Sequence, residues 1–235
     1  LASGEVVGTL AIDEGPRHNP AAIATTATKA GDGWTLSGTK AFVHEAHGAA
    51  LFIVAAQTEG GVGVFAVPAD AAGLSLATRK LTDSRSHANV TLANVKVGAD
   101  AYLGGSDLLD RLLDRARIVT AAEMLGLAEH SFGVTLDYLK QRVQFDVLIG
   151  SFQALQHRAS RMFVQMQLAR SSVLAALACV DENPAFLPFY ASAAKAKMGE
   201  VMELVSSEAV QMHGGIGVTE ELDAGLYLQR GRVCV

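Results

Sequence analysis

A single change of hydrophobic period divides this sequence and limits its fold more than any other feature. Before Gly104-Gly105, apolar residues come in short runs rich in β-branched side chains, separated by glycine, aspartate and proline. After these glycines, apolar residues recur every three or four positions over long stretches. The first pattern suits pleated strands and the second suits amphipathic helices. The sequence therefore predicts an α+β chain, with a β domain over residues 1–103 and a helical domain over residues 104–235.

The first part predicts a small antiparallel β barrel or sandwich. Its strand signals follow at short intervals with no helical period between them, which disfavours a parallel βαβ sheet. The expected strands are 6–12, 23–28, 34–36, 41–43, 51–55, 62–67, 74–77 and 90–92.

The second part predicts an incomplete helical bundle. We expect one helix from Gly105 to about Gln141, one from near Ser151 to the Asn183-Pro184 break, and one from about 189 to 212. Proline ends the second helix because it cannot continue one. Three helices leave a seam that a fourth normally fills, so we expect a four-helix-type bundle.

Charge and cysteine content exclude some functions. Lys plus Arg number 19 against 24 Asp plus Glu, a net charge of −5, which disfavours a broad nucleic-acid surface. Cys179 and Cys234 suit a reducing compartment, so a cytoplasmic location is expected. His44, Glu45 and His47 lie close together, but no further ligand completes a metal site. The apolar stretches are interrupted too often to predict a membrane span.

Two strings stand out as candidate binding segments. Residues 211–217 read QMHGGIG, whose glycines allow backbone N–H groups to approach a ligand, or simply end a helix. Residues 142–153 read RVQFDVLIGSFQ and offer an arginine suited to phosphate. The alternative for this second string is a solvated loop whose two phenylalanines, Phe145 and Phe152, fill the core.

Glu123 is the candidate general base. It lies two turns after Ala116, on a face that also holds Val119, and an apolar setting would raise its pKa. The alternative is a boundary glutamate paired with an arginine or lysine. Asp114 and Arg117, three residues apart, could be a surface ion pair.

Together these segments resemble the acyl-CoA dehydrogenase family. Residues 142–145 (RVQF) and 149–157 (IGSFQALQH) are similar to its R-x-Q-F-G and I-G-x-F-Q-x-x-Q-H segments, and residues 211–217 to its Q-x-x-G-G-x-G segment. Residues 12–14 and 40–44 fall where the family has T-E-P and K-x-W-I-T. In detail the chain looks most like the divergent branch of small subunits of pimeloyl-CoA or sterol side-chain dehydrogenases.

The resemblance implies a fold and a cofactor. Family members have an N-terminal helical domain, a middle β domain and a C-terminal four-helix bundle, and this chain is expected to lack the first. They bind FAD. The residues implied at the flavin ring are Ile12, Asp13, Phe42 and His44. Those implied to reach a neighbouring subunit's FAD are Arg142, Phe145 and Gln153. Those implied at the ADP portion are Gln211, Gly214 and Gly215.

The family's reaction removes the α-proton of an acyl-CoA thioester with a glutamate while hydride leaves the β-carbon for flavin N5. Asp114 and Arg117 match positions that contact the CoA portion of the substrate. One family position for the glutamate is Ala116 here, and the commoner one falls just beyond Val235. Glu123 is therefore the carboxylate that this sequence offers.

The resemblance leaves two functions open. The first is an FAD-dependent acyl-CoA dehydrogenase that desaturates an acyl-CoA and passes electrons to an electron-transfer flavoprotein or a similar acceptor. The alternative is a non-catalytic subunit that completes the FAD site of a heteromeric acyl-CoA dehydrogenase. Both imply a homo- or hetero-oligomer, a dimer or a tetramer.

Overall fold

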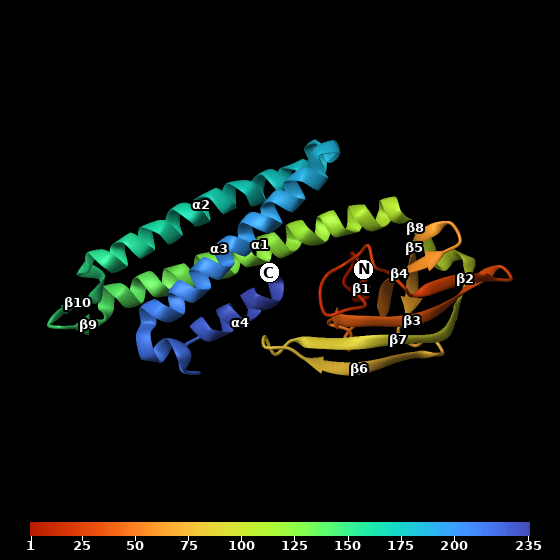
Figure 1. Ribbon diagram of the computed structural model, residues 1–235, viewed down its shortest axis with the longest axis horizontal. Coiled ribbons are helices and arrows are strands. Elements are labelled where there is room, and N and C mark those ends of the chain that lie inside the picture. The colour runs from red at the N-terminus through yellow and green to blue at the C-terminus, as the bar shows by residue number, and fades with distance from the viewer. The chain divides into compact units, whose positions relative to one another are not determined.

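The computed structural model describes residues 1–235, the whole of this sequence. Its internal contacts form two compact units, Leu1–Leu112 and Leu113–Val235. The boundary lies within the long helix α1 (Ser106–Gln141), which begins directly after the glycine pair. Figure 1 shows strands in the first unit and long helices in the second.

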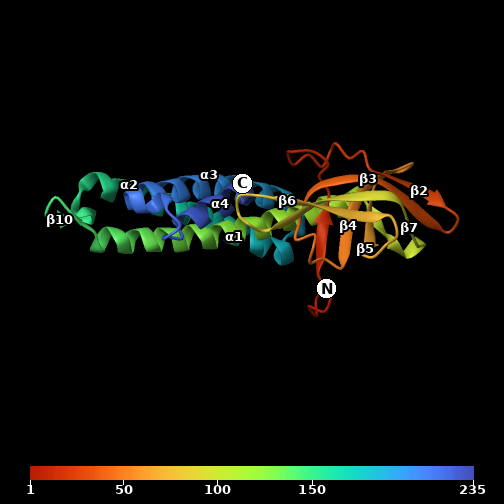
Figure 2. The same cartoon turned by 90° about the horizontal axis from the view of Figure 1, so that it is seen from below.

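The first unit is a mixed β-sheet, whose strands lie side by side in Figure 2. Its order is β6-β7-β3-β2-β4-β5-β8, and β1 pairs with β4 off this path. The strands are β1 (Gly8–Ala11), β2 (Thr26–Ala30), β3 (Gly33–His44), β4 (Leu51–Thr58), β5 (Gly61–Pro68), β6 (Leu74–Lys80), β7 (Ser86–Val97) and β8 (Tyr102–Gly105). Phe52, Phe65 and Leu36 are fully buried at the centre of its core.

The expected α+β class is confirmed, but the observed sheet differs from the expected antiparallel barrel or sandwich in two details. The sheet is open, with β6 and β8 at the two ends of the strand order. It is also mixed, because β4 pairs in parallel with both β1 and β2. The edge strand β6 ends in Arg79 and Lys80, and charged side chains on an edge oppose pairing with another chain.

The two short strands expected at 34–36 and 41–43 form one continuous strand, β3. Its pairing with β7 is irregular between Leu36 and Gly38 and again between Lys40 and Val43. The second irregularity contains Phe42, whose φ is +52°. These irregularities interrupt the alternation of side chains, which explains why the sequence pattern reads as two strands.

The second unit is a helical bundle, and its three expected helices are confirmed. α1 continues to Gln141, α2 spans Gln153–Glu182 and α3 spans Leu187–His213. The core between them contains Met124, Met162, Met198 and Met202, all completely buried. Methionine is flexible enough to fill irregular gaps between helices.

A fourth helix, α4 (Ala224–Cys234), packs against α3. Gly231 permits close packing, since a Cβ there would lie 2.7 Å from Met202 Cε. The expectation that a fourth helix fills the seam is therefore met within this chain, although the sequence pattern did not locate the helix. α4 is short and carries two arginines, so its apolar stripe is weak.

Helix α2 has a partly uncovered apolar side. One 18-residue window has a mean hydropathy of 1.4 and is 28% buried, so by length and composition alone α2 could cross a membrane. Met162, Met166 and Val173 nevertheless lie buried in the bundle core. The large exposed apolar residues of α2 are Phe163, Val164, Leu168, Leu174 and Leu177. The absence of a membrane span remains a prediction.

Phe52→Ala tests the sheet core. Phe52 is fully buried, so its truncation should lower the free energy of unfolding by about 3–5 kcal/mol. Trp34, the only tryptophan, packs edge-on against Phe65 and reports on this sheet through its fluorescence during urea unfolding. Phe189→Ala, at a residue of the helical unit that is 67% exposed, is the control and should leave the Trp34 transition unchanged.

Candidate functional site

The residues of the helical unit that the sequence predicts to bind FAD lie at one end of the bundle. There α1 connects to α2 through a hairpin of β9 (Val143–Gln144) and β10 (Val147–Leu148). Phe145 and Asp146, the turn residues, have φ values of +54° and +61°. Positive φ at both central residues is typical of the tight type I′ turn. The hairpin therefore holds its own shape at the end of α1.

Arg142 stands at the base of this hairpin. Its N–H donates to the carbonyl of Tyr138 and its carbonyl accepts from the N–H of Ile149, each at 2.9 Å. These bonds fix the backbone while the side chain remains exposed. A fixed backbone with an exposed guanidinium suits recognition of an anion.

Phe145 does not fill the core, so the alternative interpretation of this loop is wrong for that residue. Phe145 is 85% exposed, and its ring centroid lies 6.1 Å from that of Phe152, which is 37% exposed. The hairpin thus presents aromatic side chains to its surroundings.

A close contact between helices sets the position of Gln153. A Cβ at Gly150 would lie 2.7 Å from the carbonyl oxygen of Leu139, so only glycine lets this segment approach α1. Gln153 follows as the first residue of α2 and is exposed.

The end of α3 fits both interpretations of the glycine-rich string. Gly214 caps the helix with φ +64°, and its N–H donates to the carbonyl of Gln211. A Cβ at Gly214 or Gly215 would meet no atom within 4 Å, so this backbone is open to a ligand. The side chain of Gln211 is also exposed.

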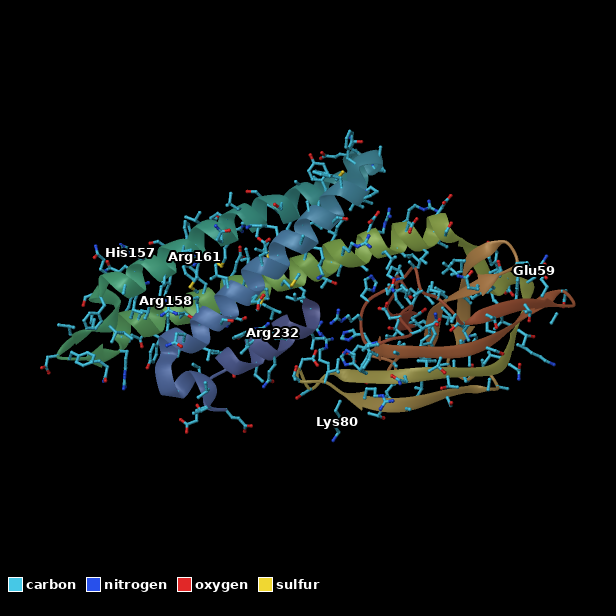
Figure 3. All side chains as sticks on the ribbon, in the orientation of Figure 1. Glu59, Lys80, His157, Arg158, Arg161 and Arg232 are labelled. Atoms are coloured by element: carbon cyan, nitrogen blue, oxygen red, sulfur yellow. The ribbon has the colours of Figure 1, made fainter.

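Two contacts tie these ends together. The rings of Tyr138 on α1 and His213 on α3 have centroids 4.5 Å apart. Arg158 on α2 pairs with Glu208 on α3 at 2.5 Å. Figure 3 labels Arg158 together with His157 and Arg161 near the start of α2. The end of α1, the start of α2 and the end of α3 therefore form one end of the bundle, as Figure 1 also shows.

This bundle end fits part of a dinucleotide. It combines an exposed guanidinium, exposed side-chain amides and open backbone at consecutive glycines. A pyrophosphate is an anion that arginine and backbone N–H groups can bind, even on a protein of net charge −5.

In the sheet unit, the segment 12–14 is held by a buried ion pair. Lys40 on β3 is completely buried, and its Nζ lies 2.7 Å from Glu14 Oε1. The same Nζ donates to the carbonyl of Ile12 at 3.0 Å. Glu14 also accepts the N–H groups of Ala24 and Thr25, at 2.8 and 2.9 Å. One lysine and one glutamate thus join β3 to residues 12–14 and 24–25.

Electrostatics explain why this pair stays together. Burial raises the pKa of Glu14, but hydrogen bonds from Lys40, Thr25 and Ala24 outweigh burial and leave that pKa below 4.5. Burial lowers the pKa of Lys40 below 10.5, and Glu14 partly offsets this. The sequence reasoning missed the pair, although a lysine between the strand signals of β3 is an available sign of it.

The four residues implied at the flavin ring belong to this sheet unit. The Ile12 side chain is buried. Asp13 accepts hydrogen bonds from His18 Nδ1 and from the N–H of Asn19, both at 2.9 Å. Phe42, 40% exposed, donates its N–H to Asn89 Oδ1 at 3.2 Å.

His44 ends β3, opposite His87 on β7. Its Nδ1 lies 2.9 Å from His87 Nε2. The sequence analysis did not identify His87 as a site residue.

Asp114 and Arg117 form an ion pair of 2.7 Å on α1. Asp114 is only 5% exposed, so this is not a simple surface pair. Arg117 lines an open depression of about 480 Å³ with Lys195 of α3. Burial lowers the pKa of Lys195, and the charge of Arg117 lowers it further against an opposing effect of Cys234. Glu200 and Glu203 line the same depression, so its charges are mixed.

Glu123 is not on the buried stripe of α1. Ile118, Ala121 and Met124 form that stripe, whereas Val119 is 66% exposed. Both oxygens of Glu123 bind Arg230 of α4, with Nε–Oε1 at 2.7 Å and a terminal N–Oε2 at 2.9 Å. This is the paired boundary glutamate of the alternative interpretation.

Comparison with family models assigns both units. The acyl-CoA dehydrogenase middle domain matches residues 12–95, and the acyl-CoA dehydrogenase C-terminal domain matches residues 104–234.

Curated relatives agree with these matches. The chain is 30% identical over 97% of its length to the mitochondrial short/branched chain specific acyl-CoA dehydrogenase of Rattus norvegicus, and spans 56% of that protein. It is 40% identical over 59% of its length to the acyl-CoA dehydrogenase IpdE2 of Mycolicibacterium smegmatis, covering 42% of that protein. The chain thus spans about half the length of these relatives.

Solved structures show the same fold. The ChsE4-ChsE5 complex from Mycobacterium tuberculosis superposes with a TM-score of 0.92 at 28% identity, over 99% of this chain and 62% of that one. The Tcur3481-Tcur3483 steroid ACAD G363A variant gives 0.91 at 35% identity, over 98% and 63%. These similarities fit the divergent branch expected from the sequence.

Glu14→Gln tests the buried pair. The change leaves the Lys40 ammonium buried without its carboxylate, so we expect unfolding free energy to fall by about 3–5 kcal/mol, followed through Trp34 fluorescence. The double variant Glu14→Gln/Lys40→Met removes the buried charge and should recover much of this loss. A double variant no more stable than the single one would contradict the assignment.

Acid titration gives a second test of Glu14. The pKa of Glu14 lies below 4.5 in the folded protein, so its contribution to stability is complete above pH 4.5. As the pH falls through the lowered pKa, that contribution is lost. Urea midpoints measured by Trp34 fluorescence should therefore decrease with falling pH in this range, and less steeply in Glu14→Gln. Equal slopes in the two proteins would exclude this linkage.

Proposed function

This chain belongs to the acyl-CoA dehydrogenase family, and we propose that it acts as an FAD-dependent acyl-CoA dehydrogenase, desaturating an acyl-CoA thioester. The observation that carries the proposal is the bundle end, where Arg142, Gln153 and Gln211 are exposed beside the open backbone of Gly214 and Gly215. These groups match the needs of the ADP and pyrophosphate portions of FAD.

FAD, when bound, supplies the acceptor for the hydride of the substrate. The residues of this chain bind and orient. Arg142 is the cation for the pyrophosphate, and Gln153 and Gln211 supply hydrogen bonds around it. The exposed Phe145 covers a neighbouring subunit's FAD.

In the sheet unit, Ile12, Asp13, Phe42 and His44 are proposed to contact the flavin ring. The Lys40–Glu14 pair supports this role because it fixes the backbone of residues 12–14. Asp114 and Arg117 are proposed to contact the CoA portion, which is anionic. A fixed backbone lowers the cost of ordering these groups on binding.

A second candidate function, a non-catalytic subunit that completes the FAD site of a heteromeric enzyme, is favoured by the environment of Glu123. Both of its carboxylate oxygens are bonded to Arg230. A general base needs an oxygen directed at the substrate proton. Because Glu123 is paired with Arg230, this second candidate function takes the general base from outside residues 1–235 or from another chain.

The proposal extends to partners and location. The exposed aromatic hairpin and the apolar side of α2 support a homo- or hetero-oligomer. An acyl-CoA substrate and an electron-transfer flavoprotein or similar acceptor follow from the proposed reaction. Both cysteines are buried and neither forms a disulfide, which supports a cytoplasmic location.

The visible spectrum of the purified full-length protein tests the proposal. A flavin band that bleaches on anaerobic addition of an acyl-CoA mixture would support the dehydrogenase. A flavin band that appears only when a second subunit is co-expressed would support the completing subunit. No flavin under either condition would contradict both.

Arg142→Ala should weaken FAD binding by about 1.5–3 kcal/mol, the usual effect of removing a charged hydrogen-bond partner. The measurement is a titration of flavin-depleted protein with FAD, followed by flavin fluorescence. Arg161→Ala is the matched control, since Arg161 is another exposed arginine near the start of α2. Equal FAD affinity in both variants would argue against this role of Arg142.

A further inference from the structure

Two histidines face each other across β3 and β7. His44 and His87 are direct partners in the antiparallel ladder, and their ring centroids lie 4.7 Å apart. His87 is 3% exposed, whereas the His44 side chain is 40% exposed. The pair therefore joins a buried ring to one that a ligand can reach.

The hydrogen bonds determine where the protons lie. His87 Nδ1 is 3.2 Å from the carbonyl oxygen of Arg85, which can only accept, so this nitrogen carries a hydrogen. In a neutral ring, His87 Nε2 is then an acceptor. His44 Nδ1, 2.9 Å away, must be the donor to it. Neutral His44 therefore has its lone pair at Nε2.

The next proton is best accommodated at His44 Nε2. This atom lies 3.8 Å from Glu45 Oε1, and the same oxygen accepts from Arg85 Nε at 2.8 Å. A proton on His87 Nε2 would instead break the bond between the rings and place a charge in a buried position. The geometry thus distinguishes two rings of identical chemistry.

The segment before His87 and strand β1 contribute polar and charged groups to the surroundings of His44. The segment before His87 contributes Arg85 and Asp83, and Asp83 accepts the N–H of Arg85 at 3.2 Å. Strand β1 contributes an uncharged group, the Thr9 hydroxyl, which donates to the carbonyl of His44 at 2.6 Å. Glu45, with Oε1 at 3.8 Å from His44 Nε2, is a carboxylate placed to favour a proton on that atom.

The backbone on either side of His44 is strained. Phe42 and Glu45 have φ values of +52° and +50°, a region that non-glycine residues rarely adopt. Such residues concentrate at functional sites, where the surrounding structure holds them. Here they flank the one ring of the pair that is accessible.

We propose that His44 Nε2 is a proton-exchanging atom and that His87 is the positioning residue that keeps the hydrogen on His44 Nδ1. Neutral His44 takes one proton at Nε2, from a bound ligand or from water, becomes an imidazolium, and returns the proton at the same atom. The ligand class is a group that can give a proton to an imidazole nitrogen and take it back. Its identity as flavin rests on the proposed function, whereas the proton arrangement does not.

Nuclear magnetic resonance of the protein without FAD, with isotope-labelled histidine, tests the arrangement directly. At mildly alkaline pH, long-range proton–nitrogen correlations should show Nδ1–H on both His44 and His87. On acidification the added proton on His44 should appear at Nε2. An Nε2–H form of neutral His44 would overturn the proposal.

Two variants separate the roles of the neighbours. His87→Leu removes the acceptor and should shift neutral His44 toward the Nε2–H form. Glu45→Gln should leave the Nδ1–H form in place but lower the proton affinity of His44 by about two- to five-fold, as for a partly exposed ion pair. His47→Asn is the control: His47 contacts Thr78 at 3.0 Å, outside this group, and its loss should change neither property.

Trp34 fluorescence checks that each variant folds. If His87→Leu does not fold, the measurements on the wild type and on Glu45→Gln test the proposal. FAD titration of the same samples separates this proposal from the proposed function. If the histidine protons lie as expected but FAD does not bind, only the proposed function is contradicted. If FAD binds but neutral His44 carries its hydrogen on Nε2, only the proposal about His44 and His87 is contradicted.

Discussion

The buried contact of Lys40 with Glu14 and the carbonyl of Ile12 is the constraint on which the sheet unit depends. It joins β3 to two segments that share no continuous ladder with it at that point. Because the ammonium has no access to water, it tolerates no loss of its acceptors. Backbone hydrogen bonds from Ala41 N–H to the carbonyl of Asp13 and from Gln57 N–H to the carbonyl of Thr25, both 2.7 Å, add to this contact. Together they hold residues 12–14 and the backbone before β2 in place.

In the helical unit a steric constraint has the same role. Gly150 lets the start of α2 approach the carbonyl of Leu139, and the open backbone of Gly214 ends α3. Gly150 fixes where α2 begins and Gly214 fixes where α3 ends. These positions in turn fix where the neighbouring polar side chains lie. The bundle end therefore owes its arrangement to backbone geometry, and the exposed polar side chains that it presents include Arg142, Gln153 and Gln211.

Sequence periodicity predicted the long helices well. A long helix repeats its apolar face over many turns, so a few residues that depart from the pattern do not hide it. It failed where the pattern is short, as in α4, and where a bulge breaks alternation, as at Phe42 in β3. Hydropathy also misplaced the buried stripe of α1, since Val119 is exposed and Ile118 is buried. Motif resemblance predicted the residues of the bundle end. No local sequence pattern pairs Arg230 with Glu123 or His87 with His44, because the partners are far apart in the chain. Only the three-dimensional structure brings them together.

The uncovered apolar side of α2 has a consequence for the chain in the cell. A surface of this kind, once covered by a partner, couples folded stability to the concentration of that partner through mass action. A copy made in excess would keep Phe163, Leu168 and Leu174 in water, where they invite chaperone binding and degradation. Turnover of uncovered copies would then keep the amount of this chain in step with the amount of whatever covers α2, without any dedicated regulator.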